Sequence, residues 1–347
     1  MSDIPFQGVA EMKHEIIERF PGISCAWMDA GRKTATECCG VSDMEKLIPV
    51  DNSTVFPACS ISKFITALCI MKLHEQKLLD VDMPVNQYLQ QWKLISTDGN
   101  ESDAAIRHIL CHTAGIVDGE DSFFGLRMGD PEISLMDILE GTTSYNSRPV
   151  RAEKPQGTAF EYSDAGYCVL QLLIEEVTHK AFDDNVRDIL CGPLGLSNTF
   201  FATPGNITRF QNRMATGYDD NGLPIPGRFP PVPDLAASGL WSTPKELLII
   251  AQAFIGALHG GSSFLQEKTA WEMTKPAGRF PWVGSGLFLD GEDTLVSQGW
   301  GENGQCMLKM NTQTKKIAVV MANRDPGVDQ KASGIEWLAD SKLKAKE

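Results

Sequence analysis

A serine followed three residues later by a lysine can supply a nucleophile and its base, because positions i and i+3 lie on one face of a helix. The sequence contains three such pairs, namely Ser60–Lys63, Ser242–Lys245 and Ser341–Lys344. About one or two pairs are expected by chance in a chain of this composition, so the spacing alone selects none of them.

The sequence around each pair separates them. Lys63 begins "KFITALCIMKLHEQKLL", residues 63–79, the longest strongly apolar helical pattern in the chain, which predicts a buried helix. A buried lysine is expected to have a lowered pKa, as a general base needs. Ser242 adjoins an expected helix N-cap, and Ser341 lies in a charged C-terminal tail. Ser60 is therefore the candidate nucleophile, and a capping serine beside a snorkelling lysine is the structural alternative.

The elements that must position these residues change along the chain. An opening helix, residues 6–20, precedes two extended segments, 23–28 and 34–43, that are expected to form a β-hairpin. Helical segments and Gly- and Pro-rich loops follow, and a helix starts at Thr243 with Glu246 expected to close a capping box. Short strands and a tail helix end the chain. The pattern predicts a sheet built from both ends of the chain, with a helical region inserted.

The expected domains are a discontinuous α/β sheet domain, residues 1–85 and 236–347, and a mostly helical domain, residues 86–235. A net charge of −14 argues against nucleic acid and anionic membranes as partners. The sequence has no apolar run of about 18 residues and no signal-peptide pattern, which predicts a cytoplasmic protein. Nine cysteines without paired spacing are expected to be small buried residues rather than disulfides.

Five segments resemble, in the same order, those of class C β-lactamases and their esterase and D-peptidase relatives. The segments are "STVFPACSISKFITALCIMKLHEQKLLDVDMPVNQYL", "AAIRHILCHTAGI", "GTAFEYSDAGYCVLQLLIEEVT", "CGPLGLSNTFF" and "AASGLWSTPKEL". The resemblance covers roughly residues 20–325. It implies a class C β-lactamase-like α/β (α+β) fold, in which an antiparallel sheet is flanked by helices and carries a mostly helical inserted domain. It also implies an active site in the cleft between the two parts.

The resemblance implies that Tyr162, within "YSDAGY", is the second catalytic element. Its hydroxyl would lie near Ser60 and Lys63 and take the serine proton as a phenolate or relay. Tyr145 and Tyr218 do not stand in a matching context. The resemblance also implies a covalent mechanism, in which the acyl group of the substrate forms an ester with Ser60 before water releases it. This mechanism requires no metal or organic cofactor.

Two departures from the family pattern concern substrate recognition. Asp164 stands where the family usually has asparagine, and an ionised aspartate can only accept hydrogen bonds. The third motif, usually Lys or His, any residue and Gly, falls on Ser297-Gln298-Gly299, and Trp300 then supplies an oxyanion N–H beside that of Ser60. A shifted register, Gly299-Trp300-Gly301, is the alternative, and neither register supplies a cation. Carboxylate recognition is therefore expected to be absent.

Other candidate residues carry weaker signals. Cys59 precedes the serine, but no histidine is placed beside it in the motif. His108 and His112 have the i, i+4 spacing of zinc ligands, but the family resemblance of their segment implies a structural role.

The expected function is that of a serine hydrolase acting on esters or on small amides or peptides, including D-amino-acid compounds. Weak β-lactam turnover at most is expected. The competing hypothesis is a non-hydrolysing penicillin-binding-like receptor or scaffold.

Overall fold

The computed structural model describes residues 13–30, 32–127, 130, 132–229, 232–261 and 264–344. Its main element is a seven-stranded antiparallel sheet in the order β3-β2-β1-β12-β11-β10-β9. The N-terminal strands are β1 (Gly22–Met28), β2 (Thr34–Asp43) and β3 (Ile48–Pro49). The C-terminal strands are β9 (Phe288–Asp290), β10 (Thr294–Gly301), β11 (Gly304–Asn311) and β12 (Ile317–Ala322). The expected hairpin and the sheet built from both ends of the chain are confirmed.

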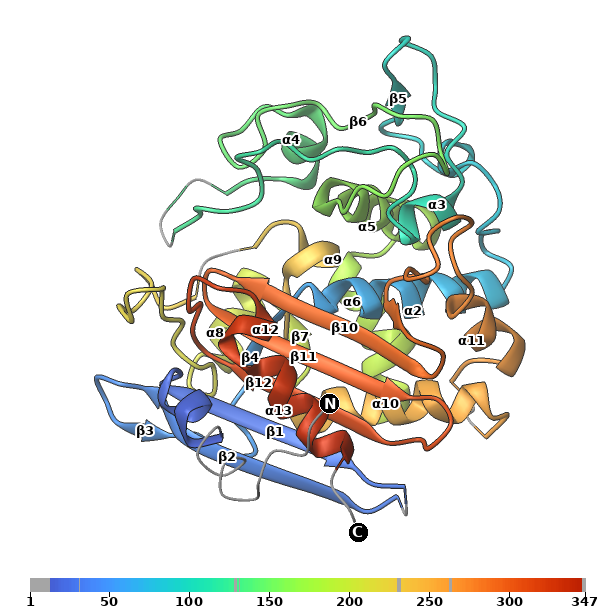
Figure 1. Cartoon of the computed structure of the whole chain (residues 1–347). Coiled ribbons are helices and arrows are strands. Elements are labelled where there is room, and N and C mark those ends of the chain that lie inside the picture. The colour runs from blue at the N-terminus through green and yellow to red at the C-terminus, as the bar shows by residue number, and fades with distance from the viewer. Residues whose placement is uncertain are drawn as a thin grey trace.

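Helices cover both faces of this sheet (Figure 1). Successive residues of a strand point to opposite faces. On β12, Ile317 and Val319 therefore pack into the core that includes α2 (Ile61–Glu75) and α10 (Pro244–Leu258). Ala318 and Val320 pack instead against α13 (Ile335–Lys344). The sheet is thus the middle of three layers.

Most of the other helices lie between the two groups of strands in the sequence. Figure 1 shows α3 (Ile106–Leu110), α4 (Leu135–Glu140) and α5 (Asp164–Thr178) gathered on one side of α2, opposite the large sheet. The remaining helices are η1 (Val85–Gln87), α6 (Phe182–Val186), the π-helical turn η2 (Arg187–Cys191), α7 (Gly192–Leu194), α8 (Pro204–Phe210), α9 (Leu235–Ser238), α11 (Glu267–Met273) and α12 (Gln330–Ser333). The division into two domains stays a prediction.

Two smaller sheets complete the fold. One has the strand order β4-β8-β7, with bounds Phe56–Cys59, Leu240–Ser242 and Phe200–Phe201. The other pairs β5 (Ile95–Ser96) with β6 (Arg151–Ala152). Since β4 leads directly into α2, its pairing with β8 fixes the point at which α2 begins.

The helix α2 is buried as expected, but its bounds differ from residues 63–79. It runs from Ile61 to Glu75, with Gln76 as its C-cap, because Lys77 adopts a left-handed φ of 61°. The N–H of Leu78 then donates to the Leu73 carbonyl at 3.1 Å, a typical helix-ending bond.

The structure tests part of the expected opening helix and the expected capping box at the start of α10. Residues 6–12 of the expected opening helix lie outside the described residues, and residues 13–18 are helical. Thr243 is the N-cap of α10, but the Glu246 carboxylate closes no capping box. It accepts the N–H groups of Ser197 and Asn198 instead. None of the helices in the described ranges has the length and apolar character needed to cross a membrane.

Candidate active site

Ser60 lies where β4 turns into α2. The preceding residue, Cys59, has a φ of 45°, a conformation that costs a non-glycine residue about 1–3 kcal/mol. Ser60 is the N-cap of α2, yet its hydroxyl makes no capping hydrogen bond. Its Oγ instead accepts a hydrogen bond from Lys63 Nζ at 3.1 Å. The hydroxyl therefore does not cap the helix and instead lies beside the side-chain nitrogen of Lys63.

Lys63 is almost completely buried, and polar groups surround its ammonium. Besides Ser60, its Nζ donates to the Ala237 carbonyl at 3.0 Å and pairs with Asp164 Oδ1 at 2.5 Å. The expectation of a lowered pKa is wrong for this lysine. Burial alone would lower the pKa of Lys63, but the Asp164 carboxylate and the Tyr162 hydroxyl outweigh it and raise the pKa above its ordinary value. Lys63 is an ammonium in the resting site.

Tyr162 lies beside the same lysine, with its ring centre 4.8 Å from Lys63 Nζ. The ring stacks on His112 at a centroid distance of 4.4 Å and faces Phe288 of β9 at 6.4 Å. Burial of the hydroxyl raises the pKa of Tyr162, and the Lys63 charge opposes the rise only in part. Tyr162 is therefore a phenol that can donate a proton, not a phenolate. Its ring is partly exposed, with 41% of the residue surface accessible.

His112 supports the tyrosine rather than a metal. Its Nδ1 accepts the N–H of Ser163 at 3.1 Å. Burial and the charge of Lys63 lower the pKa of His112 well below its ordinary value, so the ring is neutral and carries its proton on Nε2. Within the described ranges, no three His, Cys, Asp or Glu side chains form a group that could hold a metal ion.

Two carboxyl groups near Asp164 were not singled out from the sequence. Asp118 accepts hydrogen bonds from Ser163 Oγ and from the Asp164 N–H, both at 2.6 Å. Asp234 Oδ1 accepts the hydroxyl of Tyr145 at 2.6 Å. Burial and, second, the charge of Asp164 raise the pKa of Asp118 to about 6 and that of Asp234 to about 7. Neither aspartate belongs to a recognisable motif, because only the folded chain brings them to this site.

Asp234→Asn should make the protein more stable at alkaline pH. The raised pKa of Asp234 means that the fold favours the neutral acid, so its stabilising contribution is complete below about pH 4 and is lost as the pH rises through about 7. The amide is neutral throughout and still offers an oxygen to Tyr145. Between pH 5 and 8, the unfolding free energy of the variant relative to wild type should therefore rise by on the order of 2 kcal/mol.

Urea unfolding of both proteins at the two pH values measures this difference. Asp220→Asn, an exposed aspartate-to-amide change, is the control. A constant difference between variant and wild type would show that Asp234 is ionised in the fold.

A cavity of about 350 Å³ opens at Ser60. Its lining includes the carboxylates of Asp164, Glu302 and Asp325, and no lysine, arginine or histidine of the described chain lines it. Nearby, Arg127 is neutralised, because its guanidinium forms a two-pronged ion pair with Glu302 at 3.0 and 3.1 Å. Asp164 is likewise paired with Lys63, so among the described residues Asp325 is the lining carboxylate without an ion-pair partner, and no free cation lines the cavity there.

The third motif lies on β10 at one wall of this cavity. A Cβ on Gly299 would lie 2.4 Å from the Ala58 carbonyl oxygen, so only glycine fits at this close approach. This geometry favours the register Ser297-Gln298-Gly299. Ser297 itself is buried and does not line the cavity, whereas Trp300 does. Among the described residues, no contact supports the predicted role of Ser297 in binding substrate.

The other Ser–Lys pairs do not form sites of this kind. Ser242 is fully buried and shares a 2.8 Å hydrogen bond with Thr199, whereas Lys245 is exposed. The hydroxyl of Ser341 donates to the carbonyl of Leu338 within α13.

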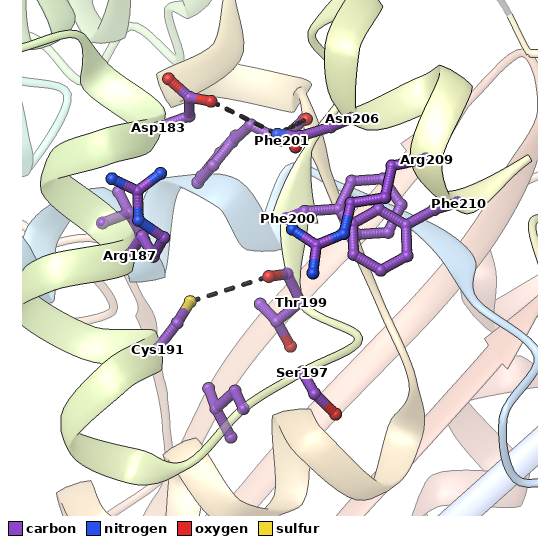
Figure 2. Close-up of a pocket in the computed structure, with 12 residues that line it drawn as sticks. Asp183, Arg187, Cys191, Ser197, Thr199, Phe200, Phe201, Asn206, Arg209 and Phe210 are labelled. Carbon is purple, nitrogen blue, oxygen red and sulfur yellow. Dashed lines mark hydrogen bonds between the residues drawn. The ribbon is translucent and has the colours of Figure 1, made fainter.

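A second cavity, of about 250 Å³, lies between α6, β7 and α8 (Figure 2). Its thiol, Cys191, donates to the carbonyl of Thr199 at 3.7 Å. Burial raises the pKa of Cys191 to about 12, which makes it a poor nucleophile. Neither lysine nor histidine from the described ranges lines this cavity. The Ser60 cavity is therefore the candidate active site.

Curated relatives match about two thirds of the chain. Protein flp of Staphylococcus aureus (strain MRSA252) is 26% identical over 235 residues, which are 66% of this chain and 42% of that protein. The "unguisins hydrolase ungD'" of Aspergillus campestris (strain IBT 28561) is 29% identical over 233 residues, which are 65% of this chain and 42% of that protein. The chain thus matches less than half the length of these two relatives.

Solved structures share the fold over nearly the whole chain. EstCE1, described as a hydrolase with promiscuous acyltransferase activity, gives a TM-score of 0.77 at 20% identity, covering 97% of this chain and 99% of its own. The D-amino acid amidase of Ochrobactrum anthropi SV3 gives 0.75 at 21% identity, covering 96% and 98%. The profile of the family described as Beta-lactamase matches residues 10–341. With this match and the shared fold, the chain belongs to the Beta-lactamase family.

Proposed function

We propose that the protein is a serine hydrolase that forms an acyl-enzyme on Ser60 with esters or small amides, including those of D-amino acids. The observation that carries the proposal is the environment of the Ser60 hydroxyl. This hydroxyl makes no helix-capping hydrogen bond, its Oγ lies 3.1 Å from Lys63 Nζ, and Ser60 lines a cavity. The similarity to a D-amino acid amidase, to EstCE1 and to a hydrolase of unguisins supports the same class of reaction.

In the proposed reaction, Ser60 Oγ attacks the carbonyl carbon, and the N–H groups of Ser60 and Trp300 hold the resulting oxyanion. The start of α2 favours this negative charge, because a helix N-terminus carries a partial positive charge. Lys63 and Tyr162 move the proton from Ser60 to the leaving group. Water then attacks the acyl-enzyme and releases the acid.

Labelling with a fluorophosphonate probe, combined with p-nitrophenyl acetate hydrolysis, tests the proposal. Mass spectrometry should find the adduct on the peptide that contains Ser60, together with steady ester turnover. An adduct on the Cys59 thiol or on Ser242 would refute the assignment. Labelling of Ser60 without any turnover would favour the receptor or scaffold hypothesis.

The lack of a free cation among the described residues that line this cavity should also set the preferred substrate. A β-lactam carboxylate would find no free cation there, and losing a charge-assisted hydrogen bond costs about 1.5–3 kcal/mol, or about ten- to a hundredfold in rate. We therefore expect kcat/KM for neutral esters or D-amino-acid amides to exceed that for a cephalosporin by at least this factor. Asp325→Asn, which removes one cavity charge, should narrow the gap by a few-fold. Efficient cephalosporin hydrolysis by the unmodified protein would contradict this expectation.

A further inference from the structure

The contact between Lys63 and Asp164 has a chemical consequence for the first proton transfer. Asp164 is the first residue of α5, and its Oδ1 lies 2.5 Å from Lys63 Nζ. The lysine side chain is 3% exposed and the aspartate side chain 21%, so water screens this ion pair little. The Lys63 ammonium has no lone pair with which to accept the Ser60 proton. It can act as a base only after giving up a proton of its own.

Asp118 binds the backbone of the first turn of α5, the turn that carries Asp164. Both oxygens of Asp118 are engaged, accepting the N–H groups of Asp164 and Ala165 at 2.6 and 3.3 Å and the Ser163 hydroxyl at 2.6 Å. Because Ser163 also accepts the Gly166 N–H, the first turn of α5 needs nothing from the Asp164 side chain. The carboxylate is left to face Lys63.

We propose that Asp164 is the terminal proton acceptor of the acylation step and works through Lys63, in a Ser60–Lys63–Asp164 relay. The inference rests on the proposed serine hydrolase function and deepens it. An asparagine amide at this position has no carboxylate oxygen that could take the proton. From the sequence, Asp164 was expected only to contact the substrate. In the proposed relay it also receives a proton from Lys63.

The step balances in atoms and charge. Lys63 passes one ammonium proton to Asp164, which leaves a neutral amine and a carboxylic acid. The amine lone pair takes the Ser60 proton as Oγ bonds to the substrate carbonyl carbon, and the carbonyl π electrons become the oxyanion. When the intermediate collapses, the bond to the leaving group breaks and that group takes the Tyr162 phenol proton. Lys63 returns a proton to Tyr162, and Asp164 returns one to Lys63.

The relay makes a prediction about the acidic limb of the pH–rate profile, the part in which the acylation rate falls as the pH is lowered. In wild type, Lys63 passes its proton to Asp164, so the acylation rate does not require Lys63 to lose a proton to solvent. In Asp164→Asn, Lys63 must instead lose its proton to solvent before it can act. The acidic limb should therefore move to higher pH by at least about one unit. A purely structural role for Asp164 would lower the rate at all pH values without moving the limb.

Several other groups face this pair and titrate or carry charge. They are Tyr162 in the segment before α5, Tyr167 and Cys168 on α5, His112 after α3, Asp118 in the following loop, Tyr145 after α4 and Asp234 before α9. The pKa of Asp118, about 6, and that of Asp234, about 7, both fall within the pH range of the experiment, so the comparison is repeated in the Asp118→Asn and Asp234→Asn backgrounds. The shift caused by Asp164→Asn should persist there.

The experiment measures, between pH 5 and 10 in the full chain, the rate at which a fluorophosphonate labels Ser60, a reaction in which Oγ bonds to phosphorus and fluoride leaves. Asp340→Asn is the matched control, because Asp340 Oδ1 lies 2.7 Å from Lys309 Nζ and Lys309 is equally buried, but remote from the cavity. Relative to wild type, we expect an unchanged limb in Asp340→Asn and a limb at least about one unit higher in Asp164→Asn.

Two results would overturn the relay while leaving the serine hydrolase proposal intact. One is an Asp164→Asn protein that labels on Ser60 with the wild-type limb. The other needs no variant and decides the matter if Asp164→Asn fails to fold, namely a wild-type limb above about pH 8. Absence of any Ser60 adduct in the wild-type protein would instead refute the proposed function itself, so the two failures are distinguishable.

Discussion

Replacing Ser60 with alanine should abolish fluorophosphonate labelling and reduce p-nitrophenyl ester turnover by at least about four orders of magnitude. The Lys63 ammonium and the oxyanion donors would remain, but the hydroxyl that accepts the hydrogen bond from Lys63 and would form the acyl-enzyme is gone. The variant should fold normally, because the Ser60 hydroxyl caps no helix and its backbone already has helical angles. Circular dichroism and thermal unfolding check this point beside the kinetic measurement.

The chain offers a control with the same spacing. Ser341→Ala removes a hydroxyl from the Ser341–Lys344 pair, which lies on α13 far along the chain, and full activity is expected. Ser242→Ala should cost stability, because it breaks a buried hydrogen bond with Thr199, but it should leave labelling of Ser60 intact. If Ser60→Ala retained esterase activity above a hundredth of wild type, the nucleophile would have to be sought elsewhere.

Replacing Tyr162 with phenylalanine should reduce turnover by about two to four orders of magnitude, the usual range for a general acid–base group. The variant keeps the ring that stacks on His112 and faces Phe288, so it loses the hydroxyl and little else. Because the raised pKa keeps Tyr162 a phenol, we assign it the role of proton donor to the leaving group. The loss should be larger for an amide than for a p-nitrophenyl ester, since an amine must be protonated to leave.

Tyr218→Phe is the control for this change. The Tyr218 hydroxyl accepts the N–H of Met44 at 2.6 Å, away from the Lys63 cluster. Its removal should cost about 1 kcal/mol of stability and leave both activities unchanged. Equal losses for amide and ester in Tyr162→Phe would mean that the hydroxyl does not protonate the leaving group. Unchanged turnover would mean that Lys63 handles the proton alone.

Local patterns in the sequence were sufficient for much of the fold. The strands β10 to β12 and the hairpin of β1 and β2 follow from alternating or continuous apolar runs between turn residues, which depend on neighbours in sequence. The burial of α2 follows from its apolar surface in the same way. The end of α2 was placed too late because "QKLL" continues the helical pattern, whereas Lys77 adopts a left-handed conformation there.

The sequence by itself also determined that Ser60 and Lys63 would meet, because an i, i+3 spacing on one helix needs no tertiary contact to bring two side chains together. The protonation state of Lys63 was decided only by the tertiary structure. Burial alone lowers the pKa of a lysine, but Asp164 is 101 positions further along the chain and reaches Lys63 only because α5 packs against α2. Electrostatic energies depend on the distance between charges in space, and the spacing of residues along a chain does not fix that distance.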